Sequence, residues 1–112
     1  MKKIKPTIKG KKNYFPNTDL LMMAGDIYGI DEGKHKHENC TQIIYVVRGS
    51  IDITTESGRE TFIAGEVVNI PPGEWHKVEV LTVSTRILML KYRSTGVDII
   101  KELADDYRRR KT

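Results

Sequence analysis

GIDEGKHKHENCTQIIYVVRG (residues 29–49) and GEVVNIPPGEWH (residues 65–76) are the two stretches that decide the fold. Together they hold every histidine of the chain and one glutamine, in the order His35, His37, Gln42 and His76. Alternate side chains of a strand point to the same face, so a strand through the first two histidines would present both imidazoles to one side. Imidazole is a common ligand of first-row transition metals. The pattern therefore predicts a metal site.

The glycines and prolines around these side chains are regularly spaced. From Gly29, five residues precede His35-Lys36-His37, four more precede Gln42, and six more precede Gly49. From Gly65, five residues precede Pro71-Pro72-Gly73, and two more precede His76. This spacing resembles the cupin superfamily, whose first motif is Gly, five residues, His-x-His, three or four residues, Glu, six residues, Gly. Its second motif is Gly, five residues, Pro-x-Gly, two residues, His, three residues, Asn, and eight of the ten specified positions match here.

The resemblance implies an all-β, single-domain jelly-roll barrel (a double-stranded β-helix) that holds a divalent metal. It implies that the ligands are His35, His37, Gln42 and His76, and that the ion is zinc, manganese, iron, nickel or cobalt. Two positions depart from the family pattern. Val80 replaces an asparagine that is not a ligand, and Gln42 replaces the usual glutamate. Some metal-dependent members, including polyketide cyclase-like proteins, also carry glutamine there, so metal binding is still implied.

Gln42 bears on the predicted chemistry. A neutral amide leaves the full charge of a divalent ion uncompensated, which favours Lewis-acid catalysis and an anionic ligand and disfavours higher oxidation states. We therefore predict metal-assisted isomerase, cyclase or lyase chemistry on a small oxygen-rich or anionic molecule. The alternatives are a non-catalytic sensor that binds a sugar or another small molecule, a metal-dependent dioxygenase, and a structural barrel with vestigial histidines.

Several side chains have more than one interpretation. Gln42 either ligates the metal or hydrogen-bonds a metal-bound water or the substrate, and without a metal the histidines would hydrogen-bond a ligand. Glu38 could supply a carboxylate, although strand parity points it away from His37. Cys40 is expected in the turn between the ligands, as an inert thiol rather than a nucleophile. Four further side chains belong either to the core or to the barrel mouth: Met22, Tyr28, Trp75 and Met89.

The remaining sequence predicts short strands and one helix. Residues 41–47 are β-branched and aromatic, which indicates a strand buried on both faces, against the second sheet or a subunit interface. Further strands are expected at residues 51–55, 60–63, 67–70, 77–83 and 86–92. The chain divides into a basic arm (1–18), a barrel (19–93), and a C-terminal amphipathic helix with a basic tail (94–112). The helix is expected to pack on the barrel or to bind a partner.

Charge is unevenly distributed along the 112 residues. The two ends, 1–12 and 108–111, hold ten of the nineteen positive charges and none of the fifteen acids, so the body carries a formal −6. A nucleic-acid partner is therefore not expected, and the ends are read as solvated or as a weak contact for an anionic partner. No apolar run suits a membrane span or a signal peptide, so we expect a cytoplasmic protein. Cys40 is the only cysteine, which excludes an intrachain disulfide. A homodimer through exposed strands and a small-molecule ligand are expected.

Overall fold

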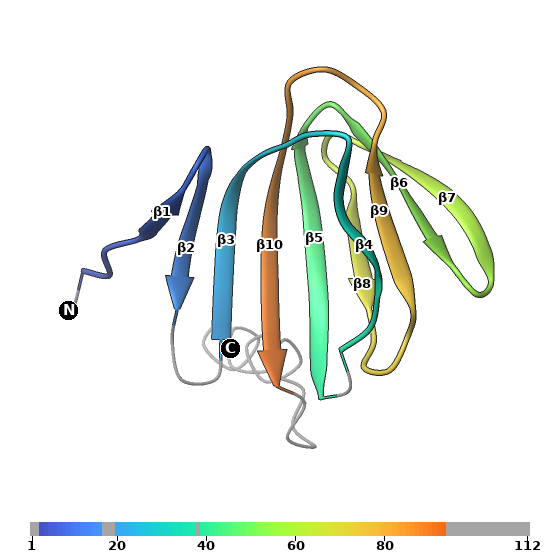
Figure 1. Cartoon of the computed structure of the whole chain (residues 1–112), viewed down its shortest axis with the longest axis horizontal. Coiled ribbons are helices and arrows are strands. Elements are labelled where there is room, and N and C mark those ends of the chain that lie inside the picture. The colour runs from blue at the N-terminus through green and yellow to red at the C-terminus, as the bar shows by residue number, and fades with distance from the viewer. Residues whose placement is uncertain (1–2, 17–19, 38, 94–112) are drawn as a thin grey trace, which may run out of the picture.

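The computed structural model describes residues 3–16, 20–37 and 39–93. Their regular structure is entirely β, in two antiparallel sheets (Figure 1). The order of the six-stranded sheet is β1 (Thr7–Lys9), β2 (Lys12–Pro16), β3 (Leu20–Ile27), β10 (Thr85–Arg93), β5 (Cys40–Arg48) and β8 (Val67–Ile70). That of the four-stranded sheet is β4 (Ile30–His35), β9 (His76–Val80), β6 (Ser50–Thr55) and β7 (Gly58–Ile63). The prediction of an all-β fold is confirmed.

The helix predicted for residues 94–112 lies outside the described residues, as does Glu38. Within the described ranges, the structure has no helix with the length and apolar character needed to cross a membrane.

Both sheets contribute one face to a shared core. The six-stranded sheet supplies buried side chains that include Met23, Ile44 and Met89, and the four-stranded sheet supplies others that include Ile51 and Val78. These residues alternate with outward-facing ones along each strand, as burial of a single face requires. The core therefore lies between the sheets, and any site that opens from it is lined by inward-facing side chains.

Strand β5 is buried on one face only. Gln42, Ile44 and Val46 face inward and are buried. Tyr45 and Val47, on the opposite face, are 38% and 46% exposed. The prediction that this strand is buried on both faces is therefore wrong for the single chain, because the four-stranded sheet covers only one side of it. The outward face joins other exposed apolar side chains of the same sheet.

Residues 7–16, within the segment predicted to be a basic arm, form β1 and β2. Strand β2 pairs with β3 and passes close to Gly25, where an added Cβ would lie 2.4 Å from the carbonyl oxygen of Lys11 and 2.7 Å from Cα of Lys12. Only glycine allows such an approach without a backbone shift. Tyr14 on β2 consequently packs against the core.

Three glycines of the two motifs lie in turns between strands and have positive φ angles. Gly29, Gly49 and Gly65 have φ angles of 58°, 85° and 92°. At Gly49 a Cβ would also lie 2.5 Å from the hydroxyl oxygens of both Thr82 and Thr85, so the turn between β5 and β6 has no room for a side chain. Strand β9 is shorter than predicted and ends at Val80, where the chain turns toward β10.

Candidate metal centre

The three histidines converge from two neighbouring strands. His35 ends β4 and His76 begins β9, and the two are directly opposite each other in the antiparallel pair. Their ring centroids are 4.2 Å apart, and His37 lies 4.9 Å from His35 and 5.6 Å from His76 by the same measure. The prediction that His35 and His37 share a strand is wrong, because β4 ends at His35. His37 lies two residues beyond the end of β4, and its ring still reaches the cluster.

The distances between the imidazole nitrogens are close to those expected for nitrogens that bind one shared ion. One ring nitrogen from each histidine lies within 4.8 Å of those of the other two. Two nitrogens bound at about 2.1 Å to the same ion are separated by at most about 4.2 Å. A shift of less than about one ångström would therefore bring all three into coordination distance.

Backbone carbonyls orient two of the rings. Nδ1 of His35 donates to the carbonyl oxygen of Gly33 at 2.6 Å, and Nδ1 of His76 donates to that of Glu74 at 3.1 Å. A carbonyl oxygen only accepts, so Nδ1 carries the proton and the lone pair is on Nε2. The Nε2 atoms of His35, His37 and His76 are all shielded from solvent. This is the tautomer that metal-binding histidines adopt when the other nitrogen is held by a hydrogen bond.

The turn after β8 holds the two halves of the centre together. Strand β8 ends at Ile70, and Pro71-Pro72-Gly73 reverses the chain with a φ of 79° at Gly73. The backbone N–H of Gly73 donates to the carbonyl oxygen of His37 at 2.8 Å. This bond ties the second motif to the first, and His76, three residues later, is only 1% exposed.

Gln42 lies on the six-stranded sheet, on the inward face of β5. Its side chain is 7% exposed, and Oε1 is buried with no hydrogen-bond partner among the described residues. A buried carbonyl oxygen left without a partner costs about 1–3 kcal/mol. Gln42 and His35 both line a cavity of about 50 Å³ between the sheets. A metal ion or a metal-bound water would satisfy Oε1, so the donor set fits the metal that the sequence predicts.

Two lining residues of this cavity were missed in the sequence. Lys91 enters from β10 and Tyr14 from β2. The alternation of residues 86–92 could have identified Lys91, because Ile87 and Met89 share its face. Tyr14 carried no such signal, since its strand lies within a Lys-rich segment.

The other residues considered in the sequence analysis lie in different parts of the structure. Met89 lines the cavity, while Tyr28 is 55% exposed. Trp75 lies beneath the ammonium groups of Lys34 and Lys36, whose Nζ atoms are 5.6 and 5.1 Å from its ring centroid. Cys40 is half-buried and begins β5, not the turn in which it was expected.

Met22 lies on β3 beside Leu90 of β10 and opposite Phe15 of β2. It is half-buried and does not line the cavity.

A second, larger cavity lies beside the centre. It has a volume of about 290 Å³ and is bounded by the β6–β7 hairpin and β8. Its lining combines apolar side chains such as Ile53 and Phe62 with polar ones such as Asn69 and Glu74. None of the three histidines lines it.

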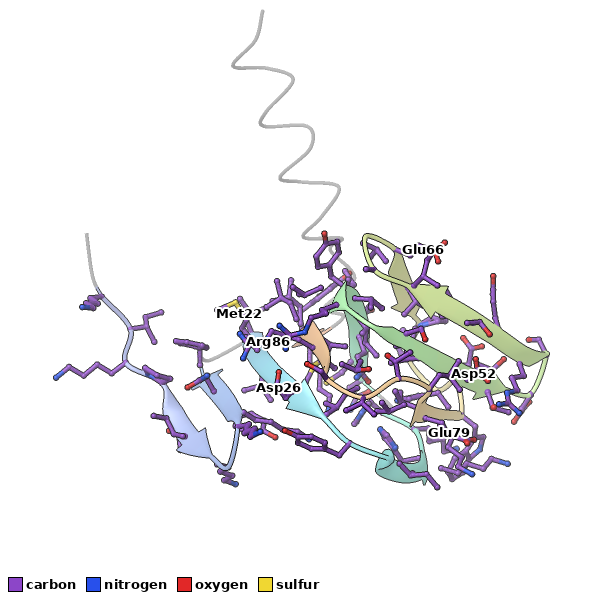
Figure 2. The ribbon with its side chains drawn as sticks, turned by 90° about the horizontal axis from the view of Figure 1, so that it is seen from above. Met22, Asp26, Asp52, Glu66, Glu79 and Arg86 are labelled. Carbon is purple, nitrogen blue, oxygen red and sulfur yellow. The ribbon has the colours of Figure 1, made fainter. Side chains whose placement is uncertain are left out.

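Two carboxylates with lowered pKa values lie outside the centre. Asp26 accepts a hydrogen bond of 2.9 Å from Nε of Arg86 on the neighbouring strand, which lowers the pKa of Asp26 (Figure 2). Asp52, on β6, is 4% exposed and accepts hydrogen bonds from the Thr61 hydroxyl, at 2.6 Å, and from Arg59. The Thr61 bond, followed by Arg59, lowers the pKa of Asp52. Both carboxylates join adjacent strands and are structural.

Comparison with known proteins agrees with this architecture. A family model described as "Cupin domain" matches residues 22–90. A cupin-2 domain containing protein from Shewanella frigidimarina is similar, with 23% identity over 70% of this chain and 74% of its own, at a TM-score of 0.61.

KdgF from Halomonas sp. is 20% identical over 80% of this chain and 87% of its own, at a TM-score of 0.63. A sugar phosphate isomerase from a cupin superfamily, from Silicibacter pomeroyi, is 14% identical over 75% and 60%, at the same TM-score. A search of curated proteins gave no match. Because the family model spans more than half of a chain whose two motifs meet in a jelly-roll core, this protein belongs to the cupin family.

Proposed function

We propose that the protein binds one divalent transition metal through His35, His37, His76 and Gln42, and acts on a small anionic or oxygen-rich organic molecule. The carrying observation is that Gln42 lines the same cavity as His35, while its buried Oε1 has no hydrogen-bond partner among the described residues. An amide oxygen and three imidazoles are neutral ligands that suit several first-row ions. The identity of the ion depends on its availability in the cell.

The proposed chemistry is non-redox. When bound, the metal would act as a Lewis acid that polarises a carbonyl or stabilises an enolate-like charge. The chain's own residues contribute orientation and exclusion of water. The backbone carbonyls of Gly33 and Glu74 hold the His35 and His76 rings, and apolar side chains such as Met89 and Ile44 line the remaining wall. Neutral ligands disfavour a higher oxidation state, which argues for isomerase, cyclase or lyase chemistry over dioxygenase chemistry.

A non-catalytic sensor is the second candidate. The larger cavity of about 290 Å³, with its mixed polar and apolar lining, favours this alternative. It predicts saturable binding of a sugar or similar molecule with no product formed, whereas the leading proposal predicts turnover that requires the metal.

Metal content tests the leading proposal. Protein purified without a histidine tag and reconstituted at neutral pH is expected to carry about one ion per chain by mass spectrometry. Acidification should release the ion, because protonated imidazole cannot bind it. His76→Ala, with its fold checked by circular dichroism, should lose the ion. Metal on fewer than about a tenth of the wild-type chains would contradict the proposal.

A further inference from the structure

Lys91 is a cationic side chain on the inward side of the six-stranded sheet. It follows Ile87 and Met89 at alternate positions of β10, and both of these are buried in the core. Across the strand pair with β5, Lys91 is directly opposite Gln42. The lysine is half-buried and lines the small cavity together with Gln42 and His35.

The cavity offers this lysine no counter-charge. The ten lining residues include no aspartate or glutamate. Six of them are apolar, namely Leu21, Met23, Ile44, Val78, Ile87 and Met89. Within the described ranges, Lys91 forms no ion pair. A partly buried cation without an anionic partner is unfavourable, and a neighbouring divalent ion with only neutral ligands would add like-charge repulsion.

We propose that Lys91 binds a carboxylate of the substrate, which lies between the lysine ammonium and the metal centre. The carboxylate would offset both positive charges. It would accept a charge-assisted hydrogen bond from the lysine ammonium and would face the metal centre on its other side. Tyr14 also lines the cavity. Lys91 is thus a specificity-determining residue, and this assignment rests on the metal site proposed above.

The small cavity favours a compact anionic group. Its volume of about 50 Å³ has room for a few water-sized groups. A carboxylate, with three heavy atoms, is smaller than a phosphate or sulfate, each of which has five. The remainder of the substrate would extend from the cavity toward solvent.

Acetate binding to cobalt-loaded protein tests the assignment. The visible absorption of the bound cobalt reports a change in its ligands without any activity assay. Acetate should change this spectrum saturably, and acetamide, its neutral counterpart of the same shape, should bind at least about tenfold more weakly. Lys91→Met, which keeps the aliphatic stem, should weaken acetate binding about 10- to 100-fold with little effect on acetamide. Lys91→Arg should retain most of the affinity.

The control is Lys5→Met, which removes the same charge from an exposed position outside the strands and should bind acetate like the wild type. Cobalt content and circular dichroism are measured for every variant. Equal acetate affinity in wild type and a folded, cobalt-loaded Lys91→Met would overturn the role of Lys91 and leave the metal site standing. Failure of the wild type to bind cobalt would overturn the metal site itself. Tighter binding of inorganic phosphate than of acetate would overturn the assignment to a carboxylate.

Discussion

Gln42 determines the charge of the proposed centre. It lies on the inward face of β5 and lines a cavity together with His35, which belongs to the other sheet. A glutamate at this position would neutralise one unit of metal charge and compete with an anionic substrate for the ion. The amide would do neither, so the proposed centre would keep its attraction for anions.

Substitution of Gln42 distinguishes direct ligation from an indirect role. If Oε1 binds the ion, Gln42→Ala should lower metal affinity by about 10- to 100-fold, and Gln42→Glu should raise it, because a carboxylate is the stronger donor. Competition with a chromogenic chelator measures these affinities. Asn69→Ala, which removes an exposed amide from β8, is the matched control and should have no effect. Equal affinities in all four proteins would exclude ligation by Gln42.

The positions of individual residues could be predicted where their spacing from glycines and prolines defined them. The three histidines could be grouped from sequence because glycines and prolines at set intervals return the chain to the same place. Strand parity misplaced His37, since β4 stops two residues before it. The alternation of Lys91 with Ile87 and Met89 could have placed it on the inward face, but its position beside Gln42 follows only from the pairing of β10 with β5.

Among the strands, polar contacts between neighbours stabilise the outer face of the four-stranded sheet. Asp52 on β6 is opposite Glu79 on β9 (Figure 2) and opposite Thr61 on β7. Arg59 donates a hydrogen bond to its carboxylate. The hydrogen bonds favour the charged form, which is why the carboxylate can be almost fully covered. This cluster stabilises the β6–β7 hairpin independently of the metal.

The lowered pKa of Asp52 predicts a specific dependence of stability on pH. A carboxyl whose pKa is lower in the folded state stabilises the fold above its unfolded value of about 3.9, and this contribution is lost as the pH falls through the folded pKa. Asp52→Asn should therefore lower the melting temperature by a few degrees at pH 7 and flatten the decline in stability on acidification. Thermal melts from pH 7 to pH 3 test this, with the exposed Glu56→Gln as control. A decline as steep as that of the wild type would show that other groups dominate.

Elements with strong β patterns were predicted, and those without were not. Strands β5, β6, β7, β8 and β10 lie close to the expected ranges, because β-branched residues alternate there between glycine turns. Strands β1 and β2 were read as an arm, since lysines are poor strand formers. Their pairing with β3 outweighs that propensity, and the close approach at Gly25 is a tertiary feature that no local pattern reveals.

For the whole molecule, the outer face of the six-stranded sheet carries several exposed apolar side chains. Tyr45 is opposite Val67, which is 56% exposed, and Leu20, on the same sheet, is 36% exposed. Surfaces of this kind commonly mark contacts between subunits. The homodimer expected from the sequence remains a prediction, and this face is where we expect it to form.

Sedimentation velocity tests the homodimer. We expect a mass of twice that of one chain, and Tyr45→Asp should shift the equilibrium toward monomer, because a charge buried in an apolar interface is costly. Ile63→Asp, which places the same charge at a 57% exposed position on the other sheet, should remain dimeric. A wild type that sediments as a monomer at micromolar concentration would contradict the prediction.

The direct pairing of His35 with His76 also bears on how the chain folds. Some forty residues separate the two histidines, so bringing them together closes a long loop at a substantial cost in conformational entropy. A ligand that binds only the closed arrangement favours it by mass action. The proposed ion would thus connect β4 with β9 and would stabilise a contact between residues about forty positions apart in the sequence.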